Sequence, residues 1–324
     1  MPDLNAIRQP VAAELARYKT LFDEALTHKD DYLGSALAYV RQRRGKMMRP
    51  LLVLLVAKEL GEVGLPTLRA AVTLEMLHTA SLVHDDVVDE SDERRAQASA
   101  NAVYGNKVAV LVGDYMLSEA LHQSALTGDI RCVDLIARLG GTLSEGEVIQ
   151  LAIIRGEDIS EAAYYDIIRR KTAELFATCA ELGALTMGAD EAFAARMRHF
   201  GEMVGMCFQI RDDIFDFYEE KNIGKPTGND MREGKLTLPV IRVIAQSTDA
   251  ALRERALRIR RGEATADDIA LMVEAAKAQG GISYARSVME QYRAKALADL
   301  EAVRQPAIKQ ALAAYLDYVI GRDY

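Results

Sequence analysis

The chain contains no tryptophan and only three cysteines among its 324 residues. The cysteines, at positions 132, 179 and 207, are odd in number and form no C-x-x-C pair, which predicts reduced thiols rather than a disulfide framework. The longest apolar block, residues 51–57, is far shorter than the ~20 residues that a membrane span needs. The start of the sequence lacks the basic segment and apolar run of a signal peptide. We therefore expect a cytoplasmic protein without a membrane anchor.

Positive charge is also scarce, because 40 lysines and arginines face 48 aspartates and glutamates, a formal net charge of −8. Nucleic acids attract basic protein faces, so this balance argues against a nucleic acid as the main partner. An anionic substrate would need a local basic pocket within an acidic protein.

Strand-like alternation is missing as well, and apolar residues recur at intervals of three and four nearly throughout. The seven prolines fall at the boundaries of these periodic segments. The pattern predicts an all-α fold that forms a single domain over residues 1–324. The irregular stretch 221–236, which contains glycines and a proline, is typical of a functional lid. The expected helices are 5–28, 30–43, 50–61, 66–90, 106–127, 130–154, 160–187, 190–220, 237–246, 249–261, 265–278, 281–303 and 306–321.

Two clusters of aspartates repeat one spacing, with carboxylates at i, i+1 and i+4. On a helix, positions i and i+4 lie on one face, separated by roughly 6 Å of rise, and like charges there repel. Each cluster falls near the C-terminal end of a long expected helix, where an acid also opposes the helix dipole by about 0.3–1 kcal/mol. The clusters are Asp85, Asp86 and Asp89, and Asp212, Asp213 and Asp216.

For one such cluster alone, a solvated acidic helix face is the simpler interpretation. The second copy instead favours a cation held between the two clusters. Ligands that are all oxygen favour magnesium, which takes one or two carboxylates and completes its octahedron with water and phosphate oxygens. We therefore predict a magnesium site that holds a diphosphate.

Basic residues lie where such a diphosphate would need them. A lysine and an arginine stand at a predicted helix start, two arginines follow the first cluster, and two lysines flank the glycine-containing stretch 221–236. His78 lies seven residues before Asp85, on the same helix face within about 20°. A surface cation, or a core histidine, is the alternative for each residue taken singly. The cationic candidates are Lys46, Arg49, Arg94, Arg95, Lys171, Lys225 and Lys235.

These residues stand in segments that resemble the trans-prenyl diphosphate synthases, and most closely the long-chain, octaprenyl-type members. The segments are GKMMRP (45–50), HTASLVHDDVVDESDERR (78–95), VGDY (112–115), EGEVIQ (145–150), KTA (171–173), FQIRDDIFD (208–216) and GKPTGNDMREGKLTLP (224–239). The resemblance implies an antiparallel helical bundle of the isoprenoid synthase type around a central catalytic cavity. Two family glycines are replaced, by Arg44 before the lysine of the first segment and by Ala96 after the arginine pair.

The resemblance also implies a role for each matching position. The aspartates would lie in or near the shell of about three magnesium ions, with Asp85, Asp89 and Asp212 as direct ligands. The allylic diphosphate would be held by Arg94, Lys171, Lys225 and Lys235. Isopentenyl diphosphate would be held by Lys46, Arg49, His78 and Arg95. Thr172 and Gln209 would line the reacting centre.

The implied reaction is ionisation of the allylic carbon–oxygen bond, attack by the double bond of isopentenyl diphosphate, and loss of a proton. Ala80 and Ser81 are small and lie just before the first cluster, where a pocket for the growing chain would begin, so a product of geranylgeranyl length or longer is expected. The family implies a homodimer, and a hydrophobic product implies transient membrane contact on release. The rival interpretations are a class I terpene cyclase and a non-catalytic, metal-binding partner subunit.

Overall fold

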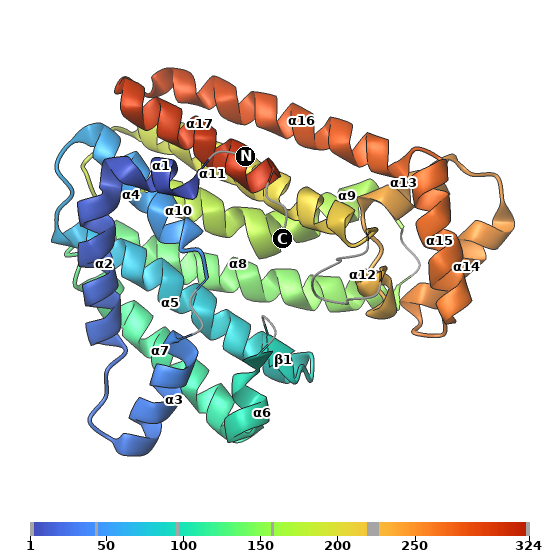
Figure 1. The fold of residues 1–324 in the computed structure, drawn as a ribbon, viewed down its shortest axis with the longest axis horizontal. Helices are drawn as coiled ribbons and strands as arrows, with labels where there is room; N and C mark the ends of the chain where they lie inside the picture. The colour runs from blue at the N-terminus through green and yellow to red at the C-terminus, as the bar shows by residue number, and fades with distance from the viewer. Residues whose placement is uncertain (1–2, 43–44, 95–96, 157–158, 219–226, 322–324) are drawn as a thin grey trace.

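Helices make up almost all the regular structure of this computed structural model (Figure 1). The structure describes residues 3–42, 45–94, 97–156, 159–218 and 227–321. Its helices are α1 (Leu4–Arg8), η1 (Gln9–Val11), α2 (Ala12–Ala25), α3 (Asp31–Arg41), α4 (Met48–Leu60), α5 (Leu65–Val88), α6 (Ala100–Tyr104), α7 (Asn106–Ala125), α8 (Ile130–Arg155), α9 (Glu161–Ile168), η2 (Arg169–Ala173), α10 (Glu174–Leu185), α11 (Glu191–Phe215), α12 (Asn229–Arg232), α13 (Leu238–Gln246), α14 (Ala250–Arg260), α15 (Ala266–Ala278), α16 (Gly281–Asp299), η3 (Leu300–Ala302) and α17 (Pro306–Gly321). The all-α prediction is confirmed.

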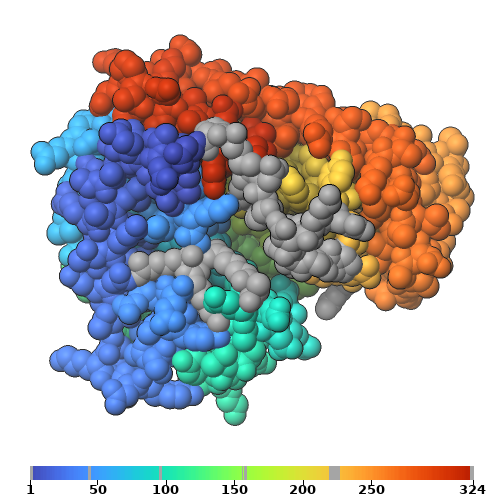
Figure 2. All heavy atoms as spheres, viewed as in Figure 1, coloured from blue at the N-terminus to red at the C-terminus, as the bar shows by residue number. Residues whose placement is uncertain are grey.

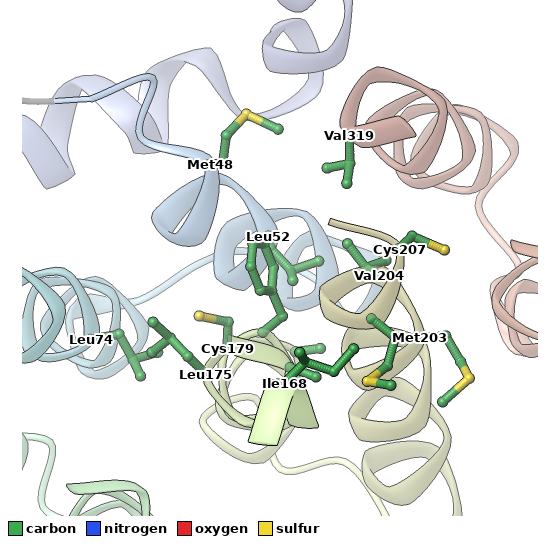
Figure 3. Packing of buried hydrophobic residues seen from close by; sticks show 14 of the residues in the cluster. Met48, Leu52, Leu74, Ile168, Leu175, Cys179, Met203, Val204, Cys207 and Val319 are labelled. Atoms are coloured by element: carbon green, nitrogen blue, oxygen red, sulfur yellow. The ribbon is translucent and has the colours of Figure 1, made fainter. Parts of the chain in front are cut away.

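Helix α4 lies in the middle of the bundle. Residues Leu51–Ala57, the longest apolar block of the sequence, are all buried, because α5 and α10 pack against this helix and α17 covers its start (Figure 3). The block is therefore a core segment. Within the described ranges, no helix is both long and apolar enough to cross a membrane.

Helix α10 also packs closely against α11, which carries the second aspartate cluster. A Cβ added to Gly201 of α11 would lie 2.3 Å from the carbonyl oxygen of Phe176 in α10, so only glycine allows this approach. The two helices are thereby held as one unit, as the side chains of Leu175, Met203 and Val204 show in Figure 3. This contact fixes the second cluster relative to the core.

The other helices surround this centre. Helix α5 packs against α7, and α11 packs against α16. Helices α13, α14 and α15 gather at one end of the molecule, beside the C-terminal end of α11 (Figure 1). In the space-filling view the surface is hollowed between the blue N-terminal helices and the orange C-terminal ones (Figure 2).

Two expected helices are interrupted within their length. The expected helix 5–28 is divided into α1, η1 and α2 at Pro10, which has no N–H for the helical ladder. The expected helix 160–187 is interrupted by η2, a π-helical segment. The irregular stretch 221–236, expected as a lid, contains the short helix α12, and its residues 221–226 lie outside the described part. The single-domain organisation stays a prediction.

A short antiparallel hairpin follows the first cluster. It pairs β1 (Glu93–Arg94) with β2 (Gln97–Ala98), with Glu93 opposite Ala98 and Arg94 opposite Gln97. Strands of two residues are too short to show alternation, so the sequence pattern could not predict them.

Candidate active site

The first aspartate cluster ends helix α5. Asp89 is the C-cap of this helix, and the chain then turns sharply at Glu90, which has a left-handed φ of 50°. A non-glycine residue in this conformation costs about 1–2 kcal/mol. The strain coincides with a carboxylate-rich turn, as is common at functional sites.

Asp86 is buried and binds the hairpin that follows the first cluster. It is 3% exposed, and its Oδ1 accepts a hydrogen bond from Nε of Arg94 at 2.6 Å. Arg94 itself is partly exposed and lines the cavity together with Asp85 and Asp89. A buried charge is stable only with such a partner.

The second cluster begins a chain of side-chain hydrogen bonds. Both oxygens of Asp213 accept: Oδ2 from the hydroxyl of Tyr164 at 2.6 Å and Oδ1 from Nε2 of Gln209 at 2.8 Å. Oε1 of Gln209 in turn accepts from the hydroxyl of Thr172 at 2.8 Å. The network joins α9, η2 and α11, so it fixes Thr172 and Gln209 relative to the cluster.

Asp216 anchors the segment that follows the second cluster. Its Oδ1 accepts from the backbone N–H of Asn229 at 2.9 Å, and its Oδ2 accepts from that of Asp230 at 3.2 Å. Asp212 contacts Nη1 of Arg211 at 3.3 Å. The three aspartates of this cluster therefore have different partners, although their spacing on the helix is regular.

Lys171 lies in the π-helical segment η2. Wide turns of this kind are frequent at functional sites. Its Nζ donates to Oε1 of Gln150 at 2.8 Å and is 2.7 Å from Oε2 of Glu147, both on α8. Gly146 makes this approach possible, since a Cβ there would lie 2.9 Å from Cγ of Lys171.

Lys235 interacts with carboxylates of both halves of the site. Burial alone would lower its pKa, but a hydrogen bond to Glu233 at 2.6 Å and the charges of Asp230 and Asp89 raise the pKa above its usual value. Asp89 belongs to the first cluster and Asp230 lies beside the second. The ammonium is thus kept charged between them.

The start of α4 supplies the basic groups on the other side. Met47 precedes the helix in the left-handed region, with φ 53° and ψ 40°. The guanidinium carbon of Arg49 lies 5.4 Å from the centre of the Phe176 ring, and its buried Nε has no hydrogen-bond partner. The Lys46 ammonium lies 5.5 Å from the centre of the Tyr318 ring.

A cavity of about 580 Å³ brings half of the predicted residues together. A smaller cavity of about 170 Å³ shares Lys171, Thr172 and Lys235 with it and extends to Gln209 and Asp213. The predicted residues that line the larger cavity are Arg49, His78, Ser81, Asp85, Asp89, Arg94, Lys171, Thr172 and Lys235.

Some predicted residues lie elsewhere. Ala80 is fully buried in the core and does not line the cavity, whereas its neighbour Ser81 does. Lys46, Asp86, Asp212 and Asp216 also do not line it. Arg95 and Lys225 lie outside the described residues. The roles predicted for these residues stay predictions.

Burial makes several of the carboxyl groups less acidic than usual. The pKa of Asp85 is raised to about 6, mainly by burial and then by Glu147, although Lys171 and Arg94 oppose the shift. Burial and the charge of Asp230 raise the pKa of Asp213. Burial and the charge of Asp216 raise that of Asp230. The part of each shift that comes from neighbouring carboxylates would be relieved by a cation bound among them.

Four neighbours of the predicted site residues have no role in the sequence predictions. They are Glu147 and Gln150, which hold Lys171, and Tyr164 and Asp230, which adjoin Asp213. Glu147 and Gln150 belong to the matching segment 145–150, and they stand three residues apart on α8, a helical spacing that gives a weak signal by itself. Nothing in the sequence links Tyr164 to a residue 49 positions away.

The carboxylates fit a divalent cation that also binds substrate. In the part of the chain that the structure describes, no three acidic, histidine or cysteine side chains form a ready metal site. Asp85 and Asp89 nevertheless present oxygens to the cavity, and magnesium needs only one or two protein carboxylates when phosphate oxygens complete its shell. The donor set therefore fits ions that bind together with a diphosphate.

The family model described as polyprenyl synthetase matches residues 30–276. The chain belongs to the polyprenyl synthetase family. It is a trans polyprenyl diphosphate synthase, a prenyltransferase of isoprenoid biosynthesis, as the motifs predict.

Relatives match along nearly the whole chain. Octaprenyl diphosphate synthase of Haemophilus influenzae is 33% identical over 100% of this chain and 95% of its own length. The crystal structure of geranylgeranyl pyrophosphate synthase from Bacteroides thetaiotaomicron is 46% identical, with a TM-score of 0.86 over 98% of each chain. That of polyprenyl synthase from Caulobacter crescentus, complexed with calcium and isoprenyl diphosphate, is 31% identical, with a TM-score of 0.90 over 99% of this chain and 98% of that one. The predicted isoprenoid synthase fold is confirmed, and the calcium complex supports a divalent metal in this family.

Proposed function

We propose that this synthase condenses isopentenyl diphosphate with an allylic diphosphate, using magnesium, to give a product of geranylgeranyl length or longer. One observation carries the proposal: a single cavity of about 580 Å³ has Asp85 and Asp89 near Lys171 and Lys235, and Arg49 and His78 on its wall. Two bound diphosphates need two separate sets of cationic side chains, and the cavity is lined by both sets. A terpene cyclase would need only one.

The allylic diphosphate would lie between the clusters. Lys171, Lys235 and Arg94 line the cavity, and each is held by an acidic partner. Fixed donors stabilise the charge that develops on a leaving diphosphate without first having to reorganise. Bound magnesium would neutralise the diphosphate further and so favour its departure.

We assign the direct metal contacts to Asp85, Asp89 and Asp212. Asp86, Asp213 and Asp216 already accept hydrogen bonds from Arg94, from Tyr164 and Gln209, and from the α12 backbone. We therefore infer that these three orient the direct ligands and the groups around them. About three ions would match the two clusters and the two diphosphates.

Isopentenyl diphosphate would bind at Arg49, His78 and Lys46, with Arg95 as a further contact. The unpaired, buried Nε of Arg49 is a donor ready for a phosphate oxygen. The double bond of isopentenyl diphosphate would then face the allylic carbon near Thr172 and Gln209. The apolar residues Leu82, Leu175 and Phe208 line the same cavity and exclude water, which would otherwise quench the allylic cation. The released diphosphate would take the proton that is lost.

We also propose a cytoplasmic homodimer that contacts membranes only during product release. Its three cysteines are free and buried, as in a reducing compartment. Apolar side chains are exposed on α7 and α8, notably Leu111 at 66%, Ile130 at 76% and Val148 at 66%. An apolar face of this kind suits an interface with a second copy.

The decisive experiment incubates the purified chain with magnesium, isopentenyl diphosphate and farnesyl diphosphate. We expect release of diphosphate and a longer polyprenyl diphosphate, identified by chromatography. Asp85→Ala and Asp212→Ala should each lower kcat by about a hundredfold or more with helix content intact. Cyclic hydrocarbon from an allylic diphosphate alone would indicate a cyclase, and no turnover with any allylic starter would indicate a silent partner subunit.

A further inference from the structure

Two cations assigned above to isopentenyl diphosphate, Lys46 and Arg49, flank a strained backbone position. Met47 lies in the left-handed region, and no side chain caps the helix that begins beside it. A conformation of this kind persists only where the surrounding structure holds it. The groups that hold it therefore control where both cationic side chains begin.

Two side chains, from opposite ends of the chain, hold this backbone. Nη2 of Arg8 donates to the carbonyl oxygen of Lys46 at 2.6 Å. The hydroxyl of Tyr315 donates to the carbonyl oxygen of Met48 at 3.0 Å. The two hydrogen bonds hold the carbonyl groups of the residues on either side of Met47, Lys46 and Met48.

Arg8 is well placed to act in this way. It ends α1, and the side chain before it, Ile7, is only 1% exposed. Helix α1 packs against α17, the helix that carries Tyr315 (Figure 1). Since the guanidinium stays charged at every physiological pH, its solvent-exposed hydrogen bond to the carbonyl is charge-assisted.

We propose that Arg8 is a positioning residue for isopentenyl diphosphate: it holds the Lys46 carbonyl so that Lys46 and Arg49 remain in their binding positions. Arg8 itself does not line the cavity. The inference rests on the proposed function for the assignment of Lys46 and Arg49. Arg8, a residue of the N-terminal helix, thereby sets the affinity for one of the two substrates.

The test is steady-state kinetics of Arg8→Ala with each substrate varied in turn. Loss of one charge-assisted hydrogen bond should raise KM for isopentenyl diphosphate about tenfold. KM for the allylic diphosphate and kcat should stay close to those of the unchanged protein. Arg8→Lys keeps the charge but not the planar fork, so it should recover part of the loss.

Arg17→Ala is the matched control. Nη1 of Arg17 also donates to a backbone carbonyl, that of Val63 at 3.1 Å, but at the opposite end of α4. We expect it to leave both KM values unchanged, even if it lowers the melting temperature as much as Arg8→Ala does. An equal rise of both KM values in Arg8→Ala, or the same effect in Arg17→Ala, would contradict the positioning role.

Arg49→Ala separates this inference from the proposed function. If it raises KM for isopentenyl diphosphate while Arg8→Ala does not, the positioning role is wrong and the substrate assignment stands. If neither variant changes that KM, the assignment of the isopentenyl site is wrong as well.

Discussion

Asp85 shows how a functional residue opposes stability. Its carboxyl is buried near Glu147, so ionising it in the ligand-free fold is unfavourable, and its pKa rises from 3.8 to about 6. Because the folded-state pKa is the higher one, the favourable contribution is fully present below pH 3.8 and is lost as the pH rises through about 6. At pH 8 the folded protein bears the full cost of this charge.

We therefore expect Asp85→Asn to raise the melting temperature of the ligand-free protein at pH 8, while kcat falls by about a hundredfold or more. The gain in melting temperature should be smaller at pH 5, where the carboxyl of the unchanged protein is largely protonated. Calorimetry at the two pH values measures the difference. A gain that is equal at both would show that the charge of Asp85 is not its cause.

At the scale of single residues, the sequence predicts which residues form the site, but it does not predict which side chains they contact. The i, i+1, i+4 spacing identified both clusters, because helical periodicity alone places their carboxylates together. It could not show that the two oxygens of Asp213 are occupied by Tyr164 and Gln209, or that Asp86 is paired with Arg94. Those contacts depend on how separate helices pack, which no local pattern records.

At the scale of elements, the π-helical segment η2 is the feature that periodicity missed. It stands where the sequence predicted one unbroken helix, and it turns Lys171 toward α8 and Thr172 toward Gln209. An extra residue in one turn changes the direction of side chains without changing composition. The helix itself was predictable, whereas the bulge was not.

Gly146 allows α8 to approach this segment, so Gly146→Ala should displace Lys171. A Cβ there would lie 2.9 Å from Cγ of Lys171 and 3.0 Å from Cβ of Arg170. We expect kcat to fall about tenfold or more, because the lysine loses its position against the diphosphate. Initial rates at saturating substrates give the measurement.

Gly141→Ala on the same helix is the control for this effect. A Cβ at Gly141 would meet nothing within 4 Å, so the substitution should only add helix propensity, worth about 1 kcal/mol of stability. Similar losses of activity in both variants would show that the helix as a whole, and not the contact with Lys171, is sensitive.

At the scale of the whole molecule, the cavity should set the length of the product. Ser81 lines it with a small side chain, so Ser81→Phe would fill part of the space available to the growing chain. We expect a shorter polyprenyl product at a similar rate of the first condensation, measured by chromatography of the dephosphorylated product. Ser81→Ala keeps the space open and should leave the product length unchanged. An unchanged product length in Ser81→Phe would show that the growing chain is limited elsewhere in the cavity.

The exposed apolar side chains of α7 and α8 should determine the oligomeric state. Leu111→Asp would place a charge at the centre of the proposed interface, so it should yield monomers by light scattering at micromolar concentration. Leu271→Asp is the matched control, because Leu271 is 51% exposed on α15, at another part of the molecule. Dimers that persist in Leu111→Asp, or monomers in both variants, would contradict this interface.

Val88 and Leu151 line the cavity, yet they are 70% and 49% exposed in the single chain. One flank of the cavity, beside the first aspartate cluster, is therefore open to water, and any methylene left there forgoes about 0.8 kcal/mol of burial. A second copy that covers this flank would make every further condensation more favourable than release. Strong dilution should then broaden the product mixture toward shorter chains, so the distribution of lengths would report on self-association during turnover.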